Sequence, residues 1–83
     1  ADVLLVVEVA KSSLDYDRTV KAPLYARAGV AELWIVDLRS RAVEVATAPG
    51  AAGFTVQECV THGAVSPRAL PDVAIDLAAL FAA

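Results

Sequence analysis

A lone glutamate stands in one of the most apolar stretches of the chain. Glu8 lies in the sequence DVLLVVEVAK, residues 2–11, directly between Val7 and Val9. An unpaired carboxylate among apolar side chains is costly to bury, so Glu8 needs a cation beside it. Two interpretations stay open: a surface glutamate at a strand end, exposed or paired with Lys11 or an arginine, or a metal ligand at a strand terminus.

The positions of the nearest lysines limit which of them can act with Glu8. Residues two apart on a strand project to the same side, and the residue two positions after Glu8 is Ala10. Lys11 points to the other side unless a bulge rotates it. Lys21, on the helix expected next, can reach back toward the strand end, although a solvated lysine is an equal interpretation.

A second acid in the same strand does not complete a metal site. Asp2 and Glu8 share a strand face, but six residues at about 3.3 Å each place their Cα atoms far apart. A second acidic ligand must therefore come from elsewhere in three dimensions. The single cysteine, Cys59, and the single histidine, His62, cannot form a zinc site without acidic help.

The hydrophobic pattern predicts a strand, a helix, three strands and a helix, in that order. The first strand, residues 3–9, is apolar on both faces, which is typical of the centre of a sheet. The helix is expected to start near Asp17 or Thr19 and to end at Gly29. Pro23 leaves a kinked, earlier start as the alternative.

The other elements follow the same signals. The helix is expected to bury apolar residues spaced by four, which are Val20, Leu24 and Ala28. Strands are expected at 32–37, 42–47 and 54–60, with a hairpin turn at 38–41 and a terminal helix at 76–81. This order predicts an α/β fold: a mixed four-stranded sheet flanked by helices, in a single domain over residues 1–83.

Composition narrows the class of protein and its partners. The hydrophobic share of 58% in only 83 residues favours apolar surface that meets another piece of protein. The net charge of −3 is the wrong sign for binding nucleic acid by charge alone, so any such contact must be local. No apolar run reaches the roughly 18 residues of a membrane span, and no signal peptide is visible. We expect a cytoplasmic protein without a membrane partner.

Several other residues have plainer interpretations than a functional one. Trp34 and Tyr25 can stack on bases, but each fits better as a core or interface residue. His62 lies in a loop without an identified acidic or nucleophilic partner, which makes it a weak general base. Arginines scattered among acids are more often surface residues than phosphate contacts, and here they are Arg18, Arg27, Arg39 and Arg41.

A long block of the chain resembles a known family. The stretch DVLLVVEVAKSSLDYDRTVKAPLYARAGVAELWIVDLRSRAVEV, residues 2–45, is similar to the signature block of the Uma family of restriction endonucleases. LPDVAIDLAALF, residues 70–81, is similar to the usual C-terminal ending of that family. The Uma family is assigned to the PD-(D/E)XK nuclease superfamily, which has a restriction endonuclease-like fold.

The resemblance implies a mechanism and assigns residues to it. In such a core, acidic residues on adjacent strands bind Mg²⁺ or Mn²⁺, and a lysine helps to activate water for phosphodiester cleavage in DNA. Glu8 matches the strand glutamate, which implies a catalytic and metal-binding role. Asp17 and Lys21 match the pair before the YA…G motif, which implies a catalytic role for Lys21 and a supporting role for Asp17.

The chain also departs from the family pattern. Relatives carry about as many residues again upstream, including the strand whose aspartate is the other metal ligand, and Asp2 does not replace that aspartate. The resemblance therefore covers the C-terminal half of an Uma-type domain, a truncated fold. One carboxylate makes a weak magnesium site, so we expect little or no cleavage by this chain itself.

A competing hypothesis makes the chain a non-catalytic interaction module. In that case it forms a homodimer or higher oligomer by pairing its exposed sheet edge and apolar face with a second copy.

Overall fold

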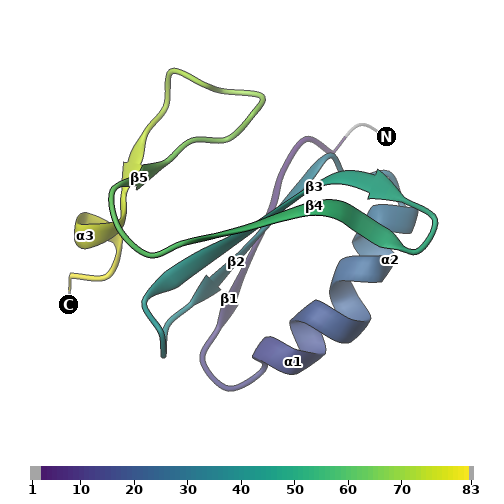
Figure 1. The fold of residues 1–83 in the computed structure, drawn as a ribbon, viewed down its shortest axis with the longest axis horizontal. Coiled ribbons are helices and arrows are strands. Elements are labelled where there is room, and N and C mark those ends of the chain that lie inside the picture. The colour runs from purple at the N-terminus through teal and green to yellow at the C-terminus, as the bar shows by residue number, and fades with distance from the viewer. Residues whose placement is uncertain (1–2, 83) are drawn as a thin grey trace.

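The chain folds into a mixed β-sheet, with a helical layer on one face and a short C-terminal segment on the other (Figure 1). This computed structural model describes residues 3–82. The strands are β1 (Val6–Ala10), β2 (Glu32–Asp37), β3 (Ala42–Gly50) and β4 (Gly53–Val60), in the order β1-β2-β3-β4. The predicted mixed α/β fold with four strands is confirmed.

One continuous helical run connects β1 to β2. It consists of α1 (Leu14–Tyr16), a π-helical segment η1 (Asp17–Lys21) and α2 (Ala22–Arg27). Because this run carries the chain back to its starting end, β1 and β2 are parallel, whereas the two following pairs are antiparallel hairpins. The predicted turn at 38–41 is confirmed, and β3 extends beyond the predicted Thr47 because Pro49 still pairs with Phe54.

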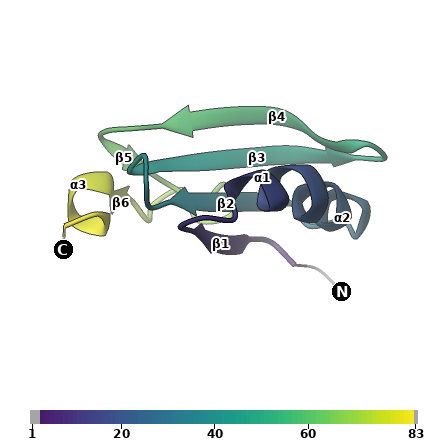
Figure 2. The same ribbon diagram turned by 90° about the horizontal axis from the view of Figure 1, so that it is seen from below.

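The position of β1 corrects a prediction. Its apolar residues on both faces indicated a central strand, but β1 lies at the edge of the sheet. Figure 2 shows it as the outermost strand on that side. The side chains of Val7 and Val9 are accordingly 49% and 61% exposed. Asp2, which was expected to share a face with Glu8, lies outside the described residues.

The helical run begins earlier than predicted. It starts at Leu14, so the kinked start is the one observed. Pro23 has no N–H, and in a regular helix its ring collides with the carbonyl four residues earlier. The turn before it is widened, because the Ala22 N–H bonds to the carbonyl of Asp17, five residues back. This π-helical turn lets Pro23 sit within a continuous helix.

The widened turn also changes which helix face is buried. Val20 and Leu24, expected in the core, are 40% and 53% exposed. Ala22 and Ala26 pack toward the sheet instead. The expected end of the helix is confirmed: Gly29 has φ = 84°, and the Val30 N–H bonds to the Tyr25 carbonyl at 3.1 Å, which closes the helix.

Two apolar clusters lie on opposite faces of the sheet. On the helical face, Leu33 and Ile35 of β2 pack with residues of α2 and β4. On the other face, Trp34 and Val36 of β2 pack with the C-terminal segment. That segment contains β5 (Ala64–Val65), β6 (Ile75–Asp76) and α3 (Leu77–Leu80).

The C-terminal elements are short. The predicted terminal helix is present as α3, and its N-cap position is Asp76. The β5–β6 ladder was not predicted, because strands of two residues are too short to show an alternating pattern.

A buried carboxylate connects the C-terminal segment to β2. Trp34 is 2% exposed, which confirms its interpretation as a core residue, and its indole N–H donates to Glu32 Oε2 at 2.7 Å. The backbone N–H of Arg68 donates to Glu32 Oε1 at 2.8 Å.

Within residues 3–82, no helix is long and apolar enough to cross a membrane.

Candidate functional site

Glu8 has two partners on the helical face of the sheet. It lies in the middle of β1 opposite the buried Ile35, and its side chain is 20% exposed. The Tyr25 hydroxyl donates to Glu8 Oε2 at 2.5 Å, and Lys21 Nζ lies 3.4 Å from both carboxylate oxygens. The cation that an acid in this strand requires is therefore Lys21.

Lys21 lies between two carboxylates. Its Nζ is 3.7 Å from Oδ1 of Asp17, whose side chain is almost fully buried. Ser13 Oγ donates to the other oxygen of Asp17, Oδ2, at 3.2 Å. Glu8 from the strand and Asp17 from the helix thus hold the lysine ammonium group from two sides.

The helical run explains why these side chains meet. Asp17, Lys21 and Tyr25 follow one another at intervals of four residues, which places them in one row along a helix. The tight connection after Ala10 brings the start of the helix directly over β1. The row therefore lies against Glu8.

These contacts fix the protonation of each group. The Tyr25 hydroxyl lowers the pKa of Glu8 against the opposing effect of burial, and Lys21 lowers it further. The hydrogen bond with Glu8 raises the pKa of Lys21, and Asp17 adds to this. At neutral pH the site therefore holds an ionised carboxylate and a charged ammonium group, and Lys21 acts as a fixed positive charge rather than as a base.

The Tyr25 phenol offers a direct test of this geometry. Its hydrogen bond to the Glu8 carboxylate, together with burial, raises its pKa above the ordinary value of about 10. Because the folded pKa is the higher one, this stabilisation is present below about pH 10 and is lost as the pH rises through the folded pKa. Ultraviolet absorbance titration in a Tyr16→Phe background should show a late transition.

The control for that titration is Glu8→Gln. This change removes the negative charge that opposes ionisation of Tyr25, so the transition should move back toward the ordinary pH. An unchanged titration curve in the Glu8→Gln protein would contradict the hydrogen bond.

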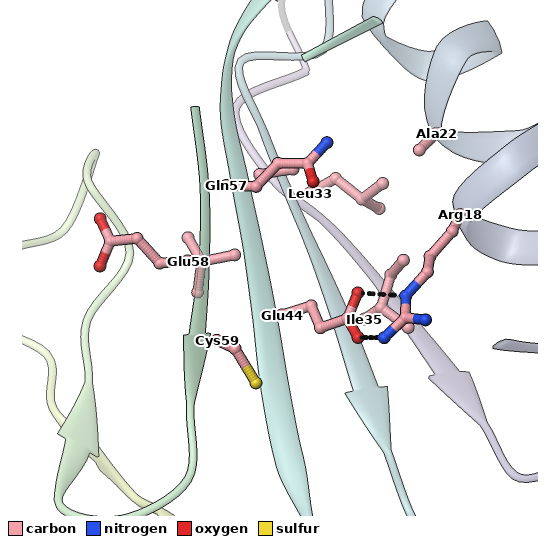
Figure 3. Close-up of a pocket in the computed structure, with 10 residues that line it drawn as sticks. Arg18, Ala22, Leu33, Ile35, Glu44, Gln57, Glu58 and Cys59 are labelled. Carbon is pink, nitrogen blue, oxygen red and sulfur yellow. Dashed lines mark hydrogen bonds and ion pairs between the residues drawn. The ribbon is translucent and has the colours of Figure 1, made fainter. Parts of the chain in front are cut away.

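A second acid shares the sheet face with Glu8 but has its own partner. Across the sheet Glu8 is opposite Ile35, and Ile35 is opposite Glu44. Figure 3 shows Arg18 reaching from the helical run to Glu44, with both of its hydrogen bonds drawn. The pair lines a cavity of about 390 Å³ bordered by Leu33, Ile35, Gln57 and Cys59.

Glu44 does not contact Glu8. Its strand lies two strand spacings, roughly 10 Å, from β1, and its carboxylate is held by Arg18. In the part of the chain that the structure describes, no three acidic, histidine or cysteine side chains converge on a common point.

The structure thus brings together Glu8, Lys21 and Asp17, the residues singled out in the sequence. Lys11 is exposed in the turn after β1, and His62 contacts Thr61 in an exposed loop. Sequence reasoning missed the role of Tyr25, because it was interpreted as a core residue. Its spacing of four from Lys21 was the available signal. It also missed the Arg18–Glu44 pair, whose members are 26 residues apart.

Comparison with known proteins identifies one family. The family model Uma2, described as "Putative restriction endonuclease", matches residues 1–78. No curated protein shows a significant match to this chain.

Proposed function

Because the chain belongs to the Uma2 family, we propose that its site serves the metal-dependent hydrolysis of phosphodiester bonds in DNA. The observation that supports this is the convergence of Lys21 and Tyr25 on the strand carboxylate Glu8. A fixed cation beside an oriented, partly exposed carboxylate is what cleavage of a phosphate ester needs. Glu8 and Lys21 are the proposed catalytic residues.

The proposed cofactor is Mg²⁺ or Mn²⁺, with Glu8 as one ligand. These hard cations prefer carboxylate and water oxygens. The described residues do not fit the ion by themselves: Asp17 is buried behind Lys21, and Glu44 is held by Arg18. A second acidic ligand must therefore come from outside residues 3–82, and by family resemblance the chain corresponds to the C-terminal half of such a nuclease domain.

The residues of this chain have distinct tasks in that proposal. The Lys21 ammonium group donates hydrogen bonds to a phosphate oxygen and offsets the negative charge that develops there. Tyr25 fixes the orientation of the Glu8 carboxylate through its 2.5 Å hydrogen bond. Asp17 holds Lys21 from the opposite side. Tyr25 and Asp17 are positioning residues.

Calorimetric titration with Mn²⁺ tests the role of Glu8 in this chain. We expect weak binding that disappears in Glu8→Gln, because a neutral amide cannot replace a carboxylate ligand. Glu58→Gln is the matched control, since the Glu58 side chain is 60% exposed at the far edge of the sheet. No binding in the wild-type protein, or equal binding in Glu8→Gln, would remove Glu8 as a ligand.

Cleavage is best tested in a longer Uma2 member that degrades DNA. Alanine at the residue matching Glu8 should abolish cleavage while leaving the protein folded. Methionine at the residue matching Lys21 should keep metal binding and slow cleavage by about 10²-fold or more. Undiminished cleavage in either variant would exclude that residue from the mechanism.

A second candidate function is a non-catalytic interaction module. It is favoured by the exposed Val7 and Val9 of β1, whose outer edge is not covered by any strand of residues 3–82. This candidate predicts self-association that depends neither on divalent metal nor on Glu8.

A further inference from the structure

Each of the two carboxylates beside Lys21 accepts a hydrogen bond from a hydroxyl group. The Tyr25 hydroxyl donates to Glu8 Oε2 at 2.5 Å, and the Ser13 hydroxyl donates to Asp17 Oδ2 at 3.2 Å. Because Ser13 holds Oδ2, the other oxygen of Asp17, Oδ1, is the one that lies 3.7 Å from Lys21 Nζ. The Ser13 hydroxyl therefore determines which oxygen of Asp17 faces the ammonium group.

Asp17 depends on this hydroxyl for its orientation. The Asp17 side chain is only 3% exposed, so a buried carboxylate has to be oriented by groups of the protein. Its distance of 3.7 Å from Lys21 is longer than a hydrogen bond, so the ion pair alone does not fix the carboxylate. The backbone N–H of Asp17 also donates to the Ser13 carbonyl at 2.9 Å. Ser13 thus contacts Asp17 through both its backbone and its side chain.

Ser13 does not use its hydroxyl as a serine at this position usually does. It lies in the connection between β1 and α1, which can be followed in Figure 1, and it occupies the N-cap position of α1. An N-cap serine normally accepts a hydrogen bond from the N–H of the second or third helical residue. The Ser13 side chain makes no such cap bond. Alanine at this position therefore removes no cap, and the helix should still form.

We propose that Ser13 is a positioning residue of this site: its hydroxyl orients the carboxylate of Asp17, and Asp17 in turn holds the ammonium group of Lys21 beside Glu8. The consequence for cleavage rests on the proposed function, because it uses Lys21 as the cation that contacts phosphate. The positioning itself involves only contacts within residues 8–21, so it can be measured in this chain without substrate or metal.

The effect of this contact should appear as order in Lys21. A lysine side chain has four rotatable bonds and loses much conformational entropy when its ammonium group is fixed. The Lys21 side chain is 38% exposed, so water is within reach when one carboxylate is lost. Loss of the Ser13 hydrogen bond should therefore increase the motion of Lys21 without unfolding the protein.

The experiment measures side-chain motion by nuclear magnetic resonance with isotope-labelled lysine. The chain contains two lysines, Lys21 and the exposed Lys11, which serves as an internal reference. In the wild-type protein the ε-methylene group of Lys21 should be the more ordered on the picosecond to nanosecond timescale. Ser13→Ala should remove much of this order, and Ser13→Thr, which keeps the hydroxyl, should restore it. Ser12→Ala is the matched control, because it removes the neighbouring exposed hydroxyl, and it should leave Lys21 ordered.

A double variant tests whether Ser13 acts through Asp17. Asp17→Asn removes the charge that attracts Lys21, so Lys21 should become mobile although Ser13 is present. Adding Ser13→Ala to Asp17→Asn should then cause no further change. A further change in the double variant would overturn the path through Asp17. Wild-type order of Lys21 in Ser13→Ala, or an equal loss of order in Ser12→Ala, would overturn the positioning role.

Cleavage separates this inference from the proposed function. In a longer Uma2 member that cleaves DNA and has a serine matching Ser13, alanine at that residue should lower kcat about tenfold and leave KM unchanged. If Ser13→Ala mobilises Lys21 in this chain but kcat is undiminished in the longer protein, the positioning is supported and the proposed catalytic role of Lys21 fails. If Lys21 stays ordered in Ser13→Ala, the inference fails and the proposed function is unaffected.

Discussion

Replacement of Glu32 by alanine is expected to destabilise the fold by about 3 kcal/mol or more. The carboxylate is 2% exposed and accepts hydrogen bonds from the Trp34 indole and the Arg68 backbone N–H. Alanine leaves both donors without a partner at a buried position and opens a cavity. Urea denaturation followed by Trp34 fluorescence measures the loss in the free energy of unfolding.

The size of this effect is large for so short a chain. At roughly 0.05–0.15 kcal/mol per residue, a domain of this length has only about 4–12 kcal/mol of stability. Glu32→Gln keeps one acceptor oxygen and should cost less than alanine. Glu58→Ala, at an exposed position, should cost less than about 0.5 kcal/mol. If Glu32→Ala costs no more than Glu58→Ala, the two hydrogen bonds do not stabilise the fold.

Leu33→Ala is expected to cost about 2–5 kcal/mol. Leu33 is 1% exposed and packs on the helical face with Ile35, Ala26 and Phe54. The change removes buried methyl groups and leaves a cavity between the sheet and the helix. Thermal unfolding monitored by circular dichroism should show a clear drop in the midpoint.

An exposed leucine supplies the control for this core substitution. Leu24 on α2 is 53% exposed, so Leu24→Ala should change stability little. A cost for Leu33→Ala below about 1 kcal/mol would mean that the helical layer packs loosely on β2.

These two predictions concern Glu32 and Leu33, neighbours on β2 whose side chains face opposite sides of the sheet. They show what the pattern of side chains along a strand can predict. The pattern of ELWIVD at 32–37 indicated a buried strand and a core Trp34, and both are observed. It did not predict the partner of Glu32, because Arg68 is 36 residues away and its N–H is a backbone group that any residue supplies.

The same pattern failed at β1 for a physical reason. Apolar residues on both faces of the strand, such as Val6 on one and Val7 on the other, show that both faces are suited to burial, but not which part of a protein covers them. The sequence therefore indicated a central strand, and the structure places it at an edge.

The candidate site was partly predictable. The lack of a lysine two residues after Glu8 directed attention to Lys21 on the helix, and the family resemblance added Asp17. Tyr25 was missed because a half-buried tyrosine resembles a core residue until its hydroxyl is placed. The early helix start was left open, since it depends on how the chain accommodates Pro23.

The π-helical turn at Asp17–Lys21 also determines where this chain tolerates a change of length. Leu14 and Ala22 both pack toward the sheet, yet eight residues of regular α-helix would leave them about 80° apart in direction. The turn absorbs one surplus residue and so keeps both flanks in phase. A one-residue deletion among Arg18, Thr19 and Val20, combined with Pro23→Ala to avoid the collision of the proline ring, would leave a regular helix with both flanks still facing the sheet. The same deletion elsewhere in the helix would rotate one flank away.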